Sequence, residues 1–340
     1  MISPGDSDSF NYPYFLYTPS TDTTTERPLL VQPNNTGATT DDFAKHRAEA
    51  RKDVEEGFAR LISDELGVPL LMPVFPRPES EPVDWRHYVH QLDTETMQIS
   101  AGPLERVDLQ LVGMIEDAQN RISSDIPLTE QVILNGFSAS GNFVNRFAVL
   151  HPELVTSVTA GGVNGMVTLP IREAKGHTLN YQIGVADVEG LTGKQFDIAE
   201  FGDVNQYIYM GAKDQNDTLQ AGDAWSDEQR EIAREVYGED MIDDRFPYCE
   251  SVYDDVDASA EFELYEGVGH AVTEAMVRDI TNFHREHAEI PDRAVESGKS
   301  DRDVSILDVL ELLGIPVEAA IAGLTTVLAG MAYLLRQVEK

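Results

Sequence analysis

The chain has 340 residues, of which 60 are Asp or Glu and 25 are Lys or Arg, so its formal net charge is −35. Such a surface repels the phosphates of nucleic acid and the anionic face of a membrane, and we expect neither as a general partner. A hydrophobic content of 41% is sufficient for a large core. The composition therefore excludes a disordered chain and predicts a folded globular protein.

The basic residues are few and are mostly arginine, with 18 Arg against 7 Lys. This composition resembles that of proteins from halophiles that accumulate salt in the cytoplasm; an ordinary acidic mesophilic enzyme is the alternative. Repulsion between unscreened carboxylates predicts that the fold loses stability at low salt and regains it when salt screens the charges.

Cysteine usage and the N-terminus give simple expectations. Cys249 is the single cysteine, so no internal disulfide forms, and no Cys/His spacing indicates a zinc site. The first ten residues contain neither a basic stretch nor an apolar run, which argues against a signal peptide. The sequence thus predicts a cytoplasmic protein.

Residues 14–287 alternate short apolar segments with longer amphipathic ones, a pattern typical of a mostly parallel sheet covered by helices. Apolar periodicity predicts one helix over residues 41–66, capped by Asp41 or Thr40. Residues 180–192 are predicted to form a loop or an inserted hairpin. The predicted strands are residues 14–17, 28–32, 68–74, 131–135, 157–160, 206–210 and 262–265, and the further helices are 104–123, 141–150, 227–237 and 273–286.

The C-terminal part differs in composition from the rest. Residues 291–303 are charged and nearly free of apolar side chains, which predicts a linker, and residues 304–340 are predicted to form a helical tail. Within that tail, residues 319–335 are seventeen positions without a charge, at the lower limit of a bilayer-spanning length. Three interpretations stay open: a helix covering the protein's own apolar surface, self-association, and membrane contact.

The most informative segment is residues 132–141, VILNGFSASG, which a helical pattern follows. An apolar strand that runs through Gly-x-Ser-x-small into a helix is the context of a nucleophile elbow, where the residues two before and two after the serine must be small. Gly136 and Ser140 satisfy this around Ser138, although Ser140 replaces the usual second glycine. The pattern alone also fits a turn that binds phosphate at a helix N-terminus.

A nucleophilic serine needs a base, and the base needs a partner that fixes its tautomer. Asp214 follows an apolar strand in QYIYMGAKDQND, and His270 ends the segment FELYEGVGH after the last predicted strand. The order Ser138, Asp214, His270 is the order of one particular fold. Asp217 is the alternative acid, and the two aspartates could instead form a solvated turn or a cation site.

Together these residues make the chain resemble a serine hydrolase of the α/β-hydrolase fold, most closely the esterase, depolymerase and dienelactone-hydrolase-like branches. The resemblance covers residues 14–287, about four fifths of the chain. It implies an α/β fold with a mostly parallel central sheet flanked by helices, a catalytic domain at residues 1–290 and a C-terminal helical extension. It also implies Ser138 as the nucleophile, Asp214 as the acid and His270 as the general base.

The same resemblance implies an oxyanion hole of two backbone N–H groups. One belongs to Ala139, and the other to the loop PNNTG at residues 33–37, where the family often has His-Gly and this chain does not. Asn35 is the expected second donor, with Asn34 or Thr36 as alternatives.

Candidate pocket residues follow the next strand. Phe75 could line an acyl pocket, and Arg77 could bind a substrate carboxylate or take part in a structural ion pair. Trp85, Tyr88 and residues 163–170 are further candidates for a pocket or a lid.

The combined prediction is hydrolysis of small-molecule carboxylic esters through an acyl-enzyme, without a metal or an organic cofactor. The same triad could act on peptides, thioesters or lactones, or transfer acyl groups. From a different class of function, the chain could be a catalytically silent binding or scaffold protein that keeps the elbow for structural reasons.

Overall fold

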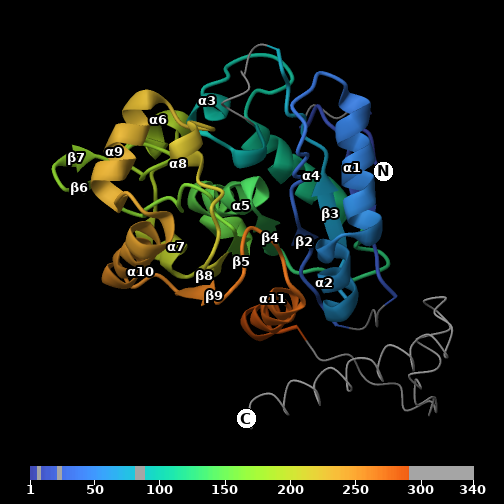
Figure 1. Cartoon of the computed structure of the whole chain (residues 1–340). Coiled ribbons are helices and arrows are strands. Elements are labelled where there is room, and N and C mark those ends of the chain that lie inside the picture. Colours follow the sequence, from blue (N-terminus) through green and yellow to red (C-terminus); the bar gives the residue numbers. More distant parts are fainter. Residues whose placement is uncertain (6–8, 21–24, 81–88, 291–340) are drawn as a thin grey trace, which may run out of the picture. The chain divides into compact units, whose positions relative to one another are not determined.

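A seven-stranded mixed sheet forms the centre of the structure, a computed structural model that describes residues 1–5, 9–20, 25–80 and 89–290 (Figure 1). Only β1 runs antiparallel to its neighbour, so the expected mostly parallel sheet is confirmed. In spatial order the strands are β1 (Tyr14–Tyr17), β3 (Leu70–Pro73), β2 (Leu30–Val31), β4 (Val132–Phe137), β5 (Val155–Gly161), β8 (Asn205–Gly211) and β9 (Ala260–Tyr265). Each of the seven predicted strands is present.

Helices cover both faces of this sheet (Figure 1). Neighbouring residues of β4 show the alternation, because Leu134 packs in the large core cluster and Ile133 in a second cluster on the opposite face. The large cluster includes side chains of α4 (Val107–Ile122) and α5 (Ala139–Leu150). The second cluster includes side chains of α2 (Phe58–Leu66) and α11 (Glu274–His287).

The single helix predicted over residues 41–66 is wrong, because the chain forms α1 (Phe43–Glu56) and α2 with a break at Gly57. Gly57 has an extended backbone, and a Cβ there would overlap the carbonyl oxygen of Asp53. The cap also differs from the prediction, since the Asp42 side chain accepts from the N–H of Ala44. Position 57 accepts only glycine, and this glycine separates two helices whose apolar residues follow one continuous pattern in the sequence.

Of the two alternatives predicted for residues 180–192, the loop is found over residues 180–187, and the hairpin lies earlier in the chain. The two-stranded hairpin is β6 (Glu173–Ala174) with β7 (His177–Thr178), and the predicted segment ends in a helix, α6 (Val188–Thr192). The remaining described helices are η1 (Val89–Gln91), α3 (Thr94–Met97), η2 (Pro152–Leu154), α7 (Ile198–Gly202), α8 (Thr218–Ala221), α9 (Asp227–Tyr237), η3 (Met241–Arg245) and α10 (Phe246–Asp255).

Contacts divide the chain into the units Met1–Arg293 and Ala294–Lys340, and the fold above is that of the first. The expected linker at 291–303, the helical tail at 304–340, Trp85 and Tyr88 lie outside the described residues. Within the described ranges, no helix combines the length and the apolar character needed to cross a bilayer.

Candidate active site

Ser138 stands at the turn between β4 and α5 with φ 62° and ψ −126°. A non-glycine residue in this region carries backbone strain of about 1–3 kcal/mol, which the surrounding structure must offset. Two hydrogen bonds hold the turn: the Ser138 N–H donates to Gly161 O at 2.9 Å, and Asn142 N–H donates to Ser138 O at 3.1 Å. The predicted nucleophile is therefore fixed on the edge where the parallel strands end.

The small residues around Ser138 are required by contact. A Cβ at Gly136 would overlap the backbone carbonyl of Ser140, and one at Gly141 would overlap Gly161 O. Ser140 also has a role that glycine could not fill. Its hydroxyl donates to Phe137 O at 2.9 Å and accepts from Phe137 N–H at 3.0 Å, so it ties the helix start to the strand end.

The predicted acid and base contact each other directly. His270 Nδ1–H donates to Asp214 Oδ2 at 2.7 Å, the Asp214 side chain is fully buried, and the imidazole is partly exposed. The second carboxylate oxygen accepts from Asn216 N–H at 2.9 Å. With its proton on Nδ1, a neutral imidazole presents Nε2 as a hydrogen-bond acceptor, which is the state that a general base needs.

Ser138 and His270 lie in the same corner of the sheet. The Phe137 ring packs on the imidazole with centroids 4.8 Å apart, and a Cβ at Gly162 would lie 3.2 Å from His270 Cε1. The hydrogen bonds of the described residues do not include one between Ser138 and His270. Nε2 instead contacts the side-chain amide of Asn216 at 3.1 Å. The sequence did not indicate a role for Asn216. The only sequence feature that connects it with the site is its position two residues after the predicted acid, Asp214.

Comparison with known proteins identifies the fold of the chain. No family model and no curated protein sequence matches the chain. Among solved structures, poly(aspartic acid) hydrolase-1 from Sphingomonas sp. KT-1 aligns with a TM-score of 0.50 at 17% identity, over 79% of this chain and 91% of that one. The chain has the α/β-hydrolase fold.

Two other solved structures are similar to this chain at lower scores. An S-formylglutathione hydrolase from Agrobacterium tumefaciens is 14% identical with a TM-score of 0.49, over 84% of this chain and 92% of that one. The fluorophosphonate-binding serine hydrolase F of Staphylococcus aureus is 12% identical with a TM-score of 0.43, over 82% of this chain and 94% of that one.

Asp217, the alternative acid, is engaged elsewhere. It precedes α8 and accepts from Leu219 N–H at 3.0 Å, which caps that helix. The same oxygen pairs with Arg245 Nη1 at 2.8 Å, and the two side chains are 6% and 0% exposed. The geometry therefore gives the imidazole contact to Asp214 and a structural ion pair to Asp217.

The candidate oxyanion donors flank the elbow. Ala139 is the first residue of α5, so its N–H is one of those that a helix leaves without an intrahelical acceptor. The exposed Asn35 side chain donates to Phe137 O at 3.2 Å, which places it beside the elbow. The Asn34 side chain is buried and bonds both backbone groups of Phe75 at 2.9 Å, and Thr36 is also buried.

The two candidate pocket residues have structural partners. Phe75 is fully buried, stacked on Phe143 at 6.0 Å, and belongs to the large core cluster, so it does not line an open acyl pocket. Arg77 pairs with Asp223 at 3.6 Å and donates to Gly37 O at 3.2 Å, which is the ion-pair alternative of the prediction. The predicted pocket and lid segment 163–170 is buried throughout.

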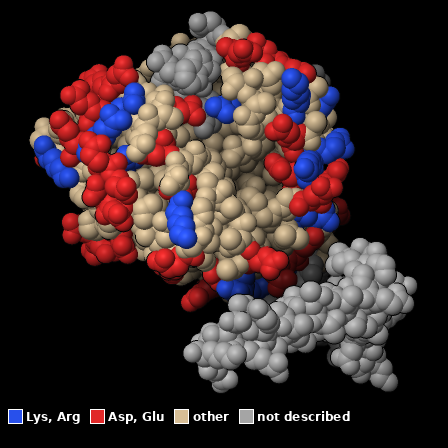
Figure 2. All heavy atoms as spheres, in the orientation of Figure 1, with Lys and Arg blue, Asp and Glu red and all other residues tan. Residues whose placement is uncertain are grey.

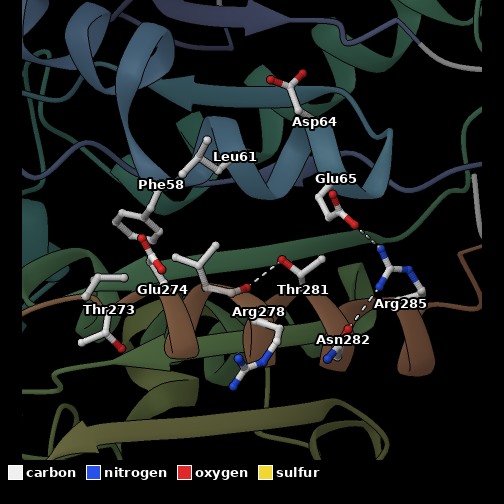
Figure 3. Close-up of a pocket in the computed structure, with 12 residues that line it drawn as sticks. Phe58, Leu61, Asp64, Glu65, Thr273, Glu274, Arg278, Thr281, Asn282 and Arg285 are labelled. Carbon is white, nitrogen blue, oxygen red and sulfur yellow. Dashed lines mark hydrogen bonds and ion pairs between the residues drawn. The ribbon is translucent and has the colours of Figure 1, made fainter. Parts of the chain in front are cut away.

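Two hollows lie near the ends of the site's loops. A polar hollow of about 640 Å³ is bordered by the acid loop and by η3, including Lys213, Asp214 and Asp243. An apolar groove of about 670 Å³ lies between α2 and α11, where Phe58 and Leu61 face α11 (Figure 3). Within the part of the chain that the structure describes, no group of three or more His, Cys, Asp or Glu residues could hold a metal ion.

Proposed function

We propose that this chain is a serine hydrolase that cleaves carboxylic esters through an acyl-enzyme intermediate. The observation that carries the proposal is the 2.7 Å hydrogen bond between His270 and the buried Asp214, at the edge of the sheet that also carries the strained Ser138. A serine on a strained turn, an imidazole and a buried carboxylate in this chain order form the arrangement that activates a hydroxyl for acyl transfer.

The chemistry follows from the roles of these groups. Ser138 Oγ attacks the ester carbonyl while its proton moves to His270 Nε2, and the N–H groups of Ala139 and Asn35 bind the oxyanion. Collapse of the tetrahedral intermediate breaks the bond to the alcohol, which leaves with the proton from His270. Water then attacks the acyl-enzyme and gives a proton to His270. As the bond between Ser138 Oγ and the acyl carbon breaks, His270 returns this proton to Oγ, and the carboxylic acid leaves. Asp214 stays ionised and stabilises the imidazolium.

The charge of the protein favours a neutral substrate and product release. A neutral ester approaches the net charge of −35 without electrostatic penalty, whereas the carboxylate formed by hydrolysis is repelled. Figure 2 shows acidic side chains spread around the rim of one face, with a less charged area in the middle.

The test is labelling of the enzyme by a fluorophosphonate probe, together with hydrolysis of p-nitrophenyl esters of increasing acyl length. We expect labelling and ester turnover in the wild type, and loss of both in Ser138→Ala with an unchanged circular dichroism spectrum. A wild-type protein that neither reacts with the probe nor turns over any ester would support the silent scaffold instead. If the enzyme hydrolysed peptides or thioesters but no oxygen esters, the assignment of the triad would stand and the proposed substrate class would be wrong.

A further inference from the structure

We propose that Asn216 is a positioning residue for the general base, holding neutral His270 in its reactive tautomer and covering Nε2 until substrate arrives. This inference rests on the proposed function, because it assigns Asn216 a part in the same site. It is suggested by the contact of the Asn216 side-chain amide with Nε2 at 3.1 Å, on the nitrogen that must later receive the proton of Ser138.

A single three-residue turn contacts both nitrogens of the imidazole. Asp214 Oδ2 accepts from Nδ1–H at 2.7 Å, and its other oxygen accepts from the backbone N–H of Asn216 at 2.9 Å. This second bond folds the turn back, so that the Asn216 side chain reaches the far nitrogen of the same ring. The carboxylate thus orients the base directly and also through Asn216.

The direction of the hydrogen bonds decides which form of the base is favoured. With Nδ1–H donating to Asp214, Nε2 has only a lone pair, so the Asn216 amide N–H donates to it. When the imidazole takes up a proton, Nε2–H faces an N–H group and the contact must break or the amide must turn its oxygen inward. The contact therefore stabilises only the neutral imidazole.

The contact also competes with the nucleophile. Nε2 has one lone pair, so it cannot accept from Asn216 and from the Ser138 hydroxyl at the same time. The turn itself is anchored, with Lys213 N–H donating to Val268 O at 2.7 Å before it and Asp217 paired to Arg245 at 2.8 Å after it. The Asn216 side chain is exposed, so it can swing into water without moving this backbone.

The charged groups around the imidazole are few. Asp214 is in contact; Lys213 and Asp217 stand on the same loop, and Asp217 is paired to Arg245. The segments that pack on the ring at 137–141 and 161–165 contain no charged residue, and the segment leading from β9 to α11 contributes Glu266 and Glu274. A carboxylate at position 216 would therefore be the second anionic group in contact with the ring.

The experiment compares Asn216→Ala and Asn216→Asp with the wild type, using kcat/KM for an ester between pH 5 and 9. Gln215→Ala, the exposed neighbour on the same turn, is the matched control and is expected to follow the wild-type profile. Loss of one hydrogen bond to the neutral base should move the acid limb of Asn216→Ala upward by roughly 0.5–1 pH unit. On the acid limb, well below its midpoint, kcat/KM then falls roughly 3- to 10-fold, while the alkaline plateau stays equal or rises.

Asn216→Asp should move the acid limb further in the same direction, because a carboxylate cannot donate to Nε2 and attracts the imidazolium. A uniform fall of kcat/KM at every pH, or a profile that superimposes on the wild type, would overturn the proposal.

A second readout does not depend on turnover. The ring nitrogens of His270 can be titrated by NMR in the Ser138→Ala background with and without Asn216→Ala, and the midpoint is expected to rise by the same 0.5–1 pH unit. If no ester is hydrolysed by the wild type, the proposed function fails while this titration still decides the role of Asn216. An unchanged midpoint refutes Asn216 as a positioning residue even in an active enzyme.

Discussion

Replacing Asp217 with asparagine tests which of the two candidate carboxylates, Asp214 or Asp217, is the acid of the triad. The change keeps the shape of the side chain and removes the charge that pairs with Arg245 at 2.8 Å, where neither side chain is more than 6% exposed. Removing one partner of a buried ion pair costs about 3–5 kcal/mol. Since Arg245 also donates to the backbone carbonyls of Gly238 and Glu239, the loss should be near the lower limit.

A loss of about 3 kcal/mol in the free energy of unfolding corresponds to a fall in Tm of roughly 5 °C for a unit that spans Met1–Arg293. Activity should change little, because Asp217 does not contact His270; we expect kcat/KM within about tenfold of the wild type below the Tm. Asp214→Asn should behave in the opposite way. It removes the charge that fixes the tautomer of His270, and kcat/KM should fall about 10³- to 10⁴-fold.

The assay measures thermal unfolding by circular dichroism and ester kcat/KM on the same preparations, at a temperature below the lowest Tm. Asp243→Asn, an exposed carboxylate bordering the same polar hollow, is the control and should change neither quantity. The assignment of the acid is refuted if Asp217→Asn loses activity by three orders of magnitude at an unchanged Tm while Asp214→Asn remains active.

Three other predictions concern the elbow, buried histidines and salt. Gly136→Ala places a Cβ against the Ser140 carbonyl and should lower the free energy of unfolding in urea by about 1–3 kcal/mol. Gly190→Ala is the control, because a Cβ there meets nothing within 4 Å. Equal urea midpoints for the two variants would contradict the prediction. Burial lowers the pKa of His90 and His284 from 6.5 to about 3, so the unfolded chain binds more protons between these values and stability falls as pH falls below 6.5. Each group should contribute about 2 kcal/mol of loss by pH 5, and His284→Gln should show a correspondingly smaller pH dependence in urea titrations. Lowering the salt from 2 M to 0.02 M should lower the Tm, and a salt-independent Tm would remove the halophile interpretation.

The parts of the fold that could be predicted from sequence are those fixed by local patterns. The inner strands are short runs of mostly apolar residues because a strand buried in a parallel sheet needs apolar side chains on both faces. At the edges, β1 is antiparallel and β9 is only partly buried. The elbow is equally local, since the space around Ser138 constrains Gly136 and Ser140 within the ten-residue stretch 132–141.

The parts that could not be predicted depend on partners distant in sequence. The role of Asp217 is set by Arg245, which lies 28 residues further along the chain in the aspartate-rich segment 240–257. That segment contains α10, whose buried residues Phe246, Cys249, Val252 and Tyr253 are flanked by aspartates at positions 243–244 and 254–255. Phe75 follows a predicted strand, and only the fold shows that it packs in the core.

The acidity of the chain can now be divided between surface and interior. Among the described acidic residues, Asp93, Asp108 and Asp214 are buried, and the side chain of Asp217 is nearly so at 6% exposure. Burial would raise the pKa of Asp108, but hydrogen bonds from Arg106 and His151 outweigh it and lower the pKa to about 2.

Each of these interior carboxylates has its own donors: Asp93 accepts from Thr96 N–H at 3.0 Å, and Asp217 pairs with Arg245. The described carboxylates at the surface lie where salt can screen them. Salt acts strongly on exposed charges and weakly on buried pairs. Salt should therefore change the Tm of this protein more than it changes kcat/KM measured on the folded enzyme. A kcat/KM that follows salt as steeply as the folded fraction, at a temperature where the protein stays folded, would show that surface charge acts on the site itself.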